Sequence, residues 1–275
     1  MPEGPEIWRA ADKISEAITG KEIEEVFFAF EELKPFEQEL QGLKVDSITP
    51  RGKAIVTSFE NHLNLYSHNQ LYGKWMIGKD GSEPETNRSL RVAIHTSDSS
   101  AFLYSASEIE MLEDGEVEAH PYIKKLGPDV VHPETTYDEV LQRYQSSSFK
   151  NRKLSTLLLD QGFLSGLGNY LRSEILFCSG VDPEFRPRDC SEDQIEALAK
   201  HSLELSRRSY KTGGLTTPDD LVKALKEEGA SRKQYRHYAY GRADKPCYKC
   251  GKEIQVMETG GRKIYYCETE QKTTN

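Results

Sequence analysis

Apolar residues near the start of the chain recur at the spacing of an α-helix. They are Ile7, Ala11, Ile14 and Ile18. Residues three, four and seven positions apart share one face of a helix, so this set forms an apolar stripe. Pro5 suits the first turn, and Gly20 suits the residue just past the end. The pattern predicts a helix over residues 5–20, directly behind a short N-terminal segment.

The next hundred residues show the pattern of strands. Four segments are rich in β-branched and aromatic residues, namely 21–30, 44–59, 62–78 and 90–107. This composition, with stretches of alternating polarity, is typical of strands. Turns are predicted at Arg51-Gly52 and around Asp98-Ser99. Because strands follow strands, we expect an antiparallel sandwich or barrel.

After Gly127-Pro128 the pattern becomes helical. Helices are predicted over 137–145, 153–163, 169–180, 191–210 and 219–229, from their apolar periodicity. The cysteines gather in the segment that follows. We therefore expect an α+β chain with three domains: a β domain over 1–125, a helical domain over 126–232 and a small module over 233–275.

Charge is distributed unevenly along the chain, which carries −9 in total. The total argues against nucleic acid, because phosphate binding needs Lys and Arg. Residues 107–118, however, hold six acidic residues and no basic one. Residues 231–252 hold Arg232, Lys233, Arg236, Arg242, Lys245, Lys249 and Lys252 against a single Asp244. Either run is readily explained as solvated surface, but the local field matters more than the total for a docking face.

Composition and cysteine count suggest an intracellular protein that binds metal. No stretch is apolar enough to span a membrane, and the first twenty residues lack the apolar run of a secretory signal. We therefore expect a cytoplasmic location. Five cysteines, an odd number, do not suggest a disulfide framework. Three of them lie near the C-terminus, which favours a metal site.

The N-terminus offers a nucleophile. The chain opens Met-Pro-Glu-Gly-Pro-Glu, and methionine is normally removed before a small second residue, which would make Pro2 the free terminus. The positive end of the helix behind it disfavours the ammonium form and lowers the pKa of the amine. A secondary amine that adds to an aldehyde carbon forms a cationic iminium, which promotes elimination at the neighbouring carbon. The sugar carbon of a nucleotide that has lost its base is such a carbon. Glu3 could move protons there, or could simply complement the helix dipole.

Five motifs give this arrangement a specific context. They are PEGPEI at the start, RGKA at 51–54, LYSHNQLYG at 65–73, LLLDQGFLSGLGNYLRSEIL at 157–176, and CYKCG followed by GRKIYYC. In this order and spacing the chain resembles the formamidopyrimidine-DNA glycosylase/endonuclease VIII family over nearly its whole length. LYSHNQLYG is most similar to the bacterial endonuclease VIII branch. The resemblance implies an N-terminal antiparallel β-sandwich with flanking helices, a helix-two-turns-helix domain and a C-terminal zinc-finger-like β-hairpin.

The resemblance also implies an activity. Family members of this kind are bifunctional DNA glycosylase/AP lyases of base excision repair, which here would excise oxidised pyrimidines and cut the strand by β,δ-elimination. Pro2 would be the Schiff-base nucleophile and Glu3 the proton donor that opens the sugar ring. Lys53 would contact a phosphate and serve the first elimination, and Arg262 the second. The residues alone would equally allow Lys53 to be an exposed hairpin lysine.

DNA-binding residues follow from the same resemblance. Gln70, Leu71 and Tyr72 would fill the gap left by an extruded nucleotide, and Lys125 and Asn169 would contact the backbone. Without the resemblance, Leu71 and Tyr72 would be read as strand residues and Asn169 as a helix N-cap. Glu6 and Glu174 are assigned supporting roles in the active site.

The C-terminal module departs from the family pattern of four cysteines. Cys247, Cys250 and Cys267 are present, and Glu270 stands at the fourth position. A carboxylate oxygen can ligate zinc, so we expect one Zn²⁺ held by these four residues. Glu268 or water could replace Glu270, or the cysteines could be packed without metal.

Other functions remain open on the sequence alone. They are an oxidised-purine glycosylase of the same family, a damaged-DNA-binding protein without catalysis, and a tautomerase that uses an N-terminal proline as a base. Tautomerases of that kind are much shorter and have no cysteine module. The expected partner is double-stranded DNA with oxidised bases or abasic sites, bound by a monomer in the bacterial cytoplasm and at the nucleoid during repair.

Overall fold

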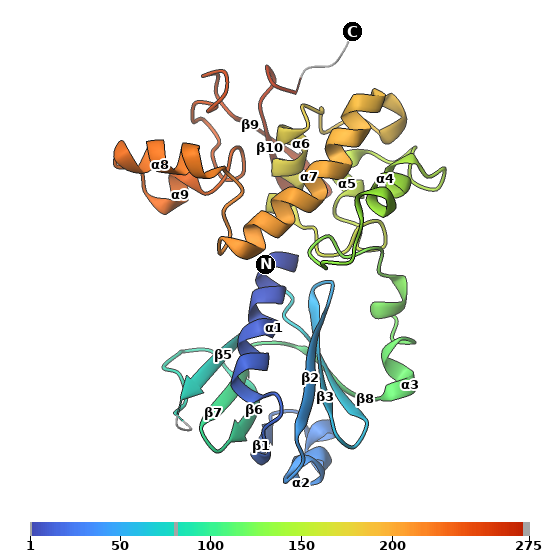
Figure 1. The fold of residues 1–275 in the computed structure, drawn as a ribbon, viewed down its shortest axis with the longest axis vertical. Coiled ribbons are helices and arrows are strands. Elements are labelled where there is room, and N and C mark those ends of the chain that lie inside the picture. Colours follow the sequence, from blue (N-terminus) through green and yellow to red (C-terminus); the bar gives the residue numbers. More distant parts are fainter. Residues whose placement is uncertain (1, 80–81, 272–275) are drawn as a thin grey trace. The chain divides into compact units, whose positions relative to one another are not determined.

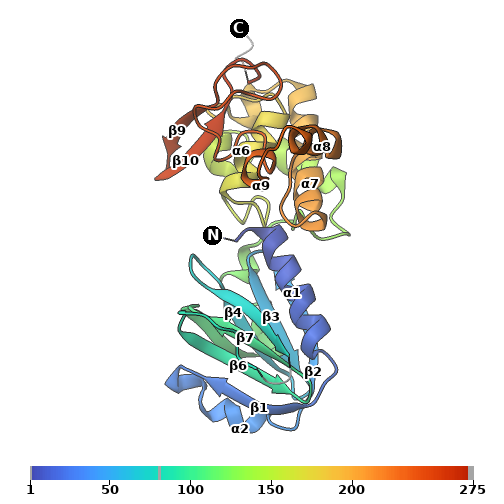
Figure 2. The same ribbon diagram turned by 90° about the vertical axis from the view of Figure 1, so that its left-hand side faces the viewer.

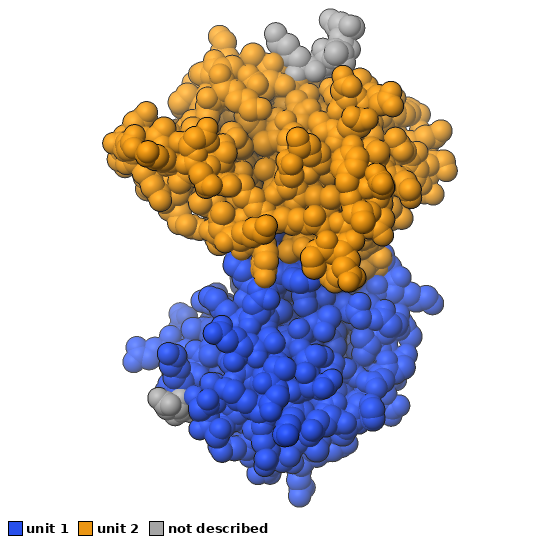
Figure 3. Space-filling model, viewed as in Figure 1, with its two compact units in different colours: residues 1–125 blue, residues 126–275 orange. Residues whose placement is uncertain are grey.

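The computed structural model describes residues 2–79 and 82–271. The chain divides into two compact units, residues 1–125 and 126–275, coloured separately in Figure 3. The division falls where the sequence pattern changes from strand to helix. The described residues 233–271 belong to the second unit, and their separation as a module of their own stays a prediction.

The first unit is built mainly of strands (Figure 1). Its helices are α1 (Gly4–Ile18), α2 (Pro35–Leu40) and α3 (Asp114–Val117), with 3₁₀ turns η1 (Glu31–Leu33) and η2 (Ile123–Lys125). Its strands are β1 (Ile23–Phe28), β2 (Val45–Arg51), β3 (Ala54–Phe59), β4 (Leu63–His68), β5 (Lys74–Lys79), β6 (Leu90–Thr96), β7 (Ser99–Tyr104) and β8 (Glu108–Glu113).

The strands form two four-stranded antiparallel sheets, which confirms the predicted sandwich. One has the order β1-β6-β7-β5 and the other β2-β3-β4-β8. The predicted turn at Arg51-Gly52 joins β2 to β3, and Gly52 there has a φ of 61°, which favours glycine. The main apolar core lies between the sheets and includes Phe28, Leu65 and Leu103. Burial of these strand faces stabilises the sandwich.

Helix α1 closes this core and contacts strands of both sheets, β2 and β3 on one side and β5 and β7 on the other. The predicted apolar stripe is buried, with Ile7 and Ile14 each 1 % exposed. The helix ends two residues before Gly20, whose φ is 75°. The N-terminus of the chain is therefore anchored to the sandwich by one helix face (Figure 2).

The acidic run is not simply a surface loop. Residues 108–113 form the edge strand β8, paired with β4, and residues 114–117 form α3. Ile109 faces the core at 6 % exposure, between the exposed or half-exposed Glu108 and Glu110. The alternation is typical of an antiparallel edge strand, in which one face packs on the core and the acidic face stays in water.

The second unit is mostly helical. Its helices are α4 (Tyr137–Gln145), α5 (Leu154–Leu157), α6 (Asn169–Cys178), α7 (Glu192–Lys211), α8 (Asp219–Glu227) and α9 (Arg232–Tyr235), with 3₁₀ turn η3 (Pro187–Asp189). Helix α7 packs on both α4 and α6. Its two strands are β9 (Gln255–Thr259) and β10 (Arg262–Tyr266).

The helix predicted over 153–163 is wrong in length. It ends at Leu157, and the chain then turns because the Asp160 carboxylate accepts from the Gly162 backbone N–H at 2.8 Å. Arg143 donates to the Phe163 carbonyl at 3.0 Å. The apolar run is buried as an irregular segment, and its carbonyls are satisfied by a side chain instead of a helix.

The C-terminal segment contains an antiparallel hairpin of β9 and β10, red in Figure 2. Gly260 and Gly261 form its turn with φ values of 59° and 70°, as a type I′ turn requires. Strand β10 packs on α6. Within the part of the chain that the structure describes, no helix has both the length and the apolar character needed to cross a bilayer.

Candidate active site, nucleic-acid interface and metal cluster

The reactive end of the chain is held by the start of α1. Glu3 is the N-cap residue, and its side chain accepts from the backbone N–H of Glu6. The Glu6 carboxylate in turn accepts from the Glu3 backbone N–H at 3.1 Å. This reciprocal capping box buries Glu3 to 4 % exposure and sets Pro2 directly before the positive helix end. Glu3 therefore has a structural role whatever its chemical one, and Glu6 supports it through the backbone.

The loop 69–73 presents the predicted gap-filling side chains. It joins β4 of one sheet to β5 of the other, and Leu71 and Tyr72 are 53 % and 67 % exposed. The loop closes through Gly73, which donates to the Asn69 carbonyl at 2.7 Å. A Cβ at Gly73 would lie 2.6 Å from that backbone, so only glycine fits. Two large apolar side chains on a tight exposed loop are not core strand residues, which rules out that reading of the sequence.

Pro2 and the loop lie around one hollow of about 400 Å³. Its lining includes Pro2, Leu71 and Tyr72, and also Trp75 at the start of β5. The fold thus brings the candidate nucleophile and two of the candidate gap-filling residues together within the first unit. Gln70 has a φ of 46°, and its side-chain amide donates to the Glu108 carboxylate.

Lys53 and Lys125 gather around Tyr122. The Lys53 backbone N–H donates to the Tyr122 hydroxyl at 2.9 Å, and the Lys125 ammonium lies 5.4 Å from the centre of that ring. Lys53 is only 7 % exposed, so the reading as an exposed hairpin lysine is wrong. A lysine with so little exposed surface needs polar partners for its charge, which favours a specific role.

His68, which the sequence did not single out, lies beside the same group. Its ring is 5.1 Å from that of Tyr122, and its Nδ1 accepts from the Gln70 backbone N–H at 3.0 Å. Burial lowers the pKa of His68, as do the charges of Lys53 and Lys125, against the opposing effect of Glu108. A neutral His68 can hold the loop by accepting a hydrogen bond. The motif LYSHNQLYG contained this residue, but Tyr122 is too distant in sequence for any local signal.

In the second unit, Asn169 is the first residue of α6 and its N-cap is Gly168, so the N-cap reading of Asn169 is wrong. The Asn169 amide donates to the Lys263 carbonyl at 3.0 Å. Arg172, fully buried, donates to the Asn169 side-chain oxygen at 2.6 Å and to the same carbonyl at 3.0 Å. These bonds tie α6 to Lys263 in β10. Its neighbour Arg262, the first residue of β10, is exposed. Arg172 was not among the residues predicted from the sequence.

Glu174 has a structural role in the second unit. Its buried carboxylate accepts from the backbone N–H groups of Tyr238, Ala239 and Tyr240 at 2.7–2.9 Å, and from the Thr216 hydroxyl. His237 bonds to Thr216 at 3.1 Å, and burial lowers its pKa to about 4. Glu174 thus organises the chain that leads into the cysteine segment.

The basic stretch 231–252 is only partly a docking surface. Arg242 is 5 % exposed, donates to the Tyr238 and Pro246 carbonyls and stacks on the Tyr248 ring. Arg232 and Arg236 donate to the Gly213 and Gly214 carbonyls. These arginines brace the loops, because a guanidinium has enough donors to satisfy several carbonyls.

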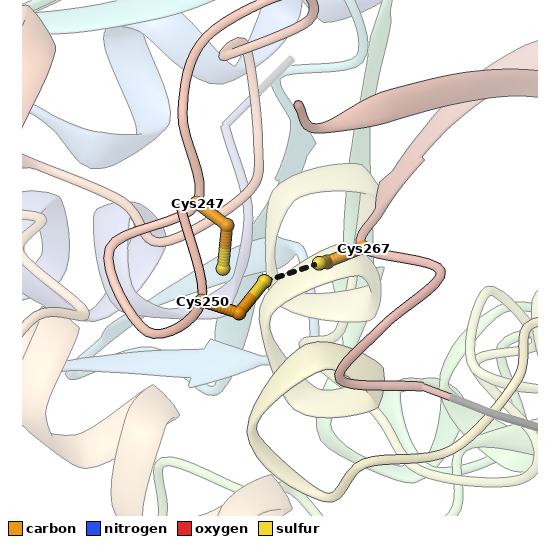
Figure 4. Close-up of side chains that lie close together, drawn as sticks. All are labelled: Cys247, Cys250 and Cys267. Carbon is orange, nitrogen blue, oxygen red and sulfur yellow. Dashed lines mark hydrogen bonds between the residues drawn. The ribbon is translucent and has the colours of Figure 1, made fainter. Parts of the chain in front are cut away.

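Three cysteines form a cluster that can hold a metal ion (Figure 4). The sulfurs of Cys247, Cys250 and Cys267 all lie within 4.8 Å of one another, and those of Cys250 and Cys267 are 3.5 Å apart. Tetrahedral zinc with Zn–S bonds of about 2.3 Å would separate its sulfurs by roughly 3.8 Å, which fits this spacing. The Glu270 carboxylate lies outside the group within 4.8 Å. The Lys252 backbone N–H lowers the pKa of Cys250, and the more distant Glu270 charge opposes it.

Comparisons with known proteins agree with this arrangement. Residues 1–107 match the sequence profile of the formamidopyrimidine-DNA glycosylase N-terminal domain, and residues 126–220 that of the family's H2TH domain. The chain is 45 % identical over 267 residues to endonuclease 8 of Escherichia coli, covering 97 % of this chain and 98 % of that one. It is also 45 % identical over 272 residues to endonuclease 8 of Salmonella arizonae, covering 99 % and 100 %.

Solved structures show the same fold. The Lactococcus lactis Fpg in complex with DNA containing an abasic site matches with a TM-score of 0.80 at 22 % identity, over 98 % of this chain and 99 % of that one. A sandwich unit opening on Pro2, followed by an H2TH domain, defines a DNA glycosylase of this class. The chain belongs to the formamidopyrimidine-DNA glycosylase/endonuclease VIII family. It is thus an enzyme of base excision repair that combines DNA glycosylase and AP lyase activities. The relatives named above, which it matches over nearly its whole length, are endonuclease 8 proteins.

Proposed function

We propose that this enzyme excises oxidised pyrimidines from duplex DNA through a Schiff base on Pro2 and cuts the strand by β,δ-elimination. The observation that carries the proposal is the shared hollow, where Pro2 lies with Leu71 and Tyr72. An enzyme that acts on a base within a duplex must extrude it, so nucleophile and wedge must reach the same nucleotide.

In the first step the nitrogen of Pro2, freed by removal of Met1, attacks C1′ of the damaged nucleotide. The bond from C1′ to the base breaks, and the departing base takes up the proton that the Pro2 nitrogen loses. Glu3 protonates the ring oxygen so that the sugar opens. The product is an iminium cation, with four bonds to nitrogen. Its charge acidifies the C2′ hydrogen, and loss of that proton expels the 3′ phosphate.

In a second elimination, loss of the C4′ proton expels the 5′ phosphate from C5′. Lys53 would contact a phosphate and move protons in the first elimination, and Arg262 would do so in the second. Burial of Lys53 and the tie between α6 and β10 beside Arg262 support these roles. Asn169 and Lys125 would contact further phosphates.

Gln70, Leu71 and Tyr72 would occupy the gap left by the extruded nucleotide. The exposure of Leu71 and Tyr72 on a closed loop supports this role, because apolar wedges replace part of the lost stacking. The bond from Gln70 to Glu108 keeps the loop in place before DNA arrives.

The cysteine cluster would hold one Zn²⁺. Cys247, Cys250 and Cys267 supply three thiolates, and Glu270 would supply the fourth ligand by turning its carboxylate toward them. When bound, the ion would contribute folding energy to the segment that carries Arg262. We further expect a monomer in the bacterial cytoplasm, associated with the nucleoid when it acts.

Borohydride trapping on DNA tests the proposal. Wild-type protein should become covalently linked to an oligonucleotide with an abasic site, and to one with an oxidised pyrimidine. Protein that keeps an uncleaved N-terminal extension should not, because its Pro2 nitrogen is an amide. The matched control carries a protease site directly before Pro2, and cleavage should restore trapping. Trapping by the extended protein would exclude Pro2, and better trapping on oxidised purines would move the enzyme to the other branch.

A further inference from the structure

The hollow beside Pro2 is lined mainly by cationic residues, although the first unit as a whole is acidic. Its cationic lining residues are Arg9, Lys13, Lys74 and Arg88, and its one acidic lining residue is Glu6. Residues 1–125 hold 13 Lys and Arg against 23 Asp and Glu. Four of those 13 cations therefore line a single hollow on a strongly acidic unit. Such a concentration marks an anion site, because the local field decides binding.

These cations reach the hollow from three separate segments. Arg9 and Lys13 lie four residues apart on α1, Lys74 begins β5, and Arg88 precedes β6. Lys13, Lys74 and Arg88 are all exposed. Within residues 2–79 and 82–271, no carboxylate lies within ion-pair distance of these three side chains, whereas Arg9 pairs with Glu6 at 3.0 Å. Like charges held together without counter-charges repel each other, and an incoming anion relieves that repulsion.

Arg88 is also positioned by the gap-filling loop. Its guanidinium donates to the Tyr72 carbonyl, so one end of the hollow is linked to the exposed tyrosine. A guanidinium has five N–H donors in a planar fork, and one bond to a carbonyl leaves others for a phosphate. Movement of the loop during extrusion would therefore move Arg88 with it.

We propose that this hollow, which we call the positive groove, binds backbone phosphates of DNA next to the extruded nucleotide. Lys13, Lys74 and Arg88 are the contacts. The inference rests on the proposed function, because Pro2, which lines the same hollow, must approach a sugar carbon. Lys13 lies seven residues beyond Glu6 on α1, which is about 10 Å along the helix axis. That length corresponds to roughly three nucleotide steps of 3.4 Å. The ligand class is a phosphodiester, from either the damaged strand or the one opposite.

The first test is the salt dependence of binding to a duplex with a stable abasic analogue, followed by fluorescence anisotropy. Each phosphate contact contributes about 0.9 to the slope of log K against log salt. We expect the double variant Lys13→Gln, Lys74→Gln to lower that slope by about two and to weaken binding about tenfold or more at low salt. The control is Lys79→Gln at the other end of β5, outside the groove. A double variant with the slope of the control would overturn the proposal.

The second test locates the strand. Single phosphates of either strand are replaced by neutral methylphosphonates, and wild-type affinity should fall at the contacted positions. The double variant should be insensitive at those positions, and their strand identifies the source of the phosphates. Equal sensitivity of both proteins at every position would also overturn the proposal.

Borohydride trapping keeps this inference separate from the proposed function. Wild-type protein should trap abasic DNA, because trapping reports the chemistry of Pro2 and the salt slope reports the phosphate contacts. Failure of wild type to trap would contradict the proposed chemistry, whereas normal trapping with an unchanged salt slope would contradict only the groove.

Discussion

In the first unit the exposed Leu71 and Tyr72 stand on a loop whose two ends continue into different sheets of one sandwich core. In the second unit the exposed Arg262 stands on a two-stranded hairpin whose nearby apolar cluster includes Cys247 and Cys267. The first loop is held by the sandwich core on which its ends stand and by hydrogen bonds, such as those from Gly73 to Asn69 and from Gln70 to Glu108. The hairpin shares its small core with thiols that can bind metal, so its rigidity depends on chemistry that the sandwich does not need.

The same two units differ in charge. Residues 126–275 hold 23 Lys and Arg against 22 Asp and Glu, so the net charge of −9 arises from the first unit. The unit with the candidate nucleophile is thus the acidic one, and its cations are placed locally, around Tyr122 and along the groove. A net charge taken over the whole chain hides this arrangement, because screening makes nearby charges dominate.

The largest expected effect separates the two roles of Glu3. Glu3→Gln keeps an acceptor for the helix start but removes the acid, so base excision should fall by about 10²–10⁴-fold. Stability should fall by less than the roughly 1 kcal/mol of a lost cap. Single-turnover kinetics measures the loss of excision, and thermal unfolding measures the loss of stability. The control is Glu6→Gln, the other half of the capping box. An equal loss of excision in that variant would mean that Glu3 acts only through the helix.

Removing a thiolate should affect the second unit and spare the first. We expect Cys250→Ser to weaken metal binding on the order of 100-fold and to reduce DNA affinity, because Arg262 would be poorly held. Glu270→Ala should weaken metal binding less, and Glu270→Cys should strengthen it. Elemental analysis and anisotropy measure these effects. The two tryptophans, Trp8 and Trp75, both lie in the first unit, so their emission should not change. Metal-free protein with full activity would contradict the zinc proposal.

Acid should destabilise the second unit through His237. Its pKa is about 4 when folded, so between the ordinary value near 6.5 and 4 only the unfolded chain takes up this proton. Stability is therefore lost as the pH falls through that window, by up to about 3 kcal/mol. His237→Asn should lower stability at neutral pH but flatten this part of the pH dependence. Urea unfolding followed by far-ultraviolet circular dichroism reports mainly the helical unit. If stability depended on pH with the same slope in wild type and in His237→Asn, the loss of stability could not be assigned to His237.

The smallest expected effect concerns the gap-filling loop. Leu71→Ala should slow excision from a paired duplex about tenfold, since the wedge offsets part of a flipping cost of a few kcal/mol. Cleavage at a preformed abasic site should change much less. Leu71→Met, which keeps an apolar side chain of similar volume, is the control. Equal losses on both substrates would argue that Leu71 serves the fold and not extrusion.

Local patterns along the sequence determined the helix behind Pro2, the antiparallel sandwich, most of the helices and the order of the motifs. These features depend on residues within a few positions of each other, where periodicity and turn chemistry are visible. The helix expected over 153–163 failed because Arg143, ten residues before it, bonds its carbonyls and stabilises an irregular path.

Only the tertiary structure decided which distant residues meet. It buried Lys53 beside Tyr122, 69 positions away, and bound Glu174 to backbone groups 64–66 positions away. It also brought Lys13, Lys74 and Arg88 around one hollow. Sequence spacing does not predict these contacts, because they follow from how the sheets and helices pack. The chain could therefore reveal its candidate nucleophile on inspection, whereas the positive groove beside it emerged only from the fold.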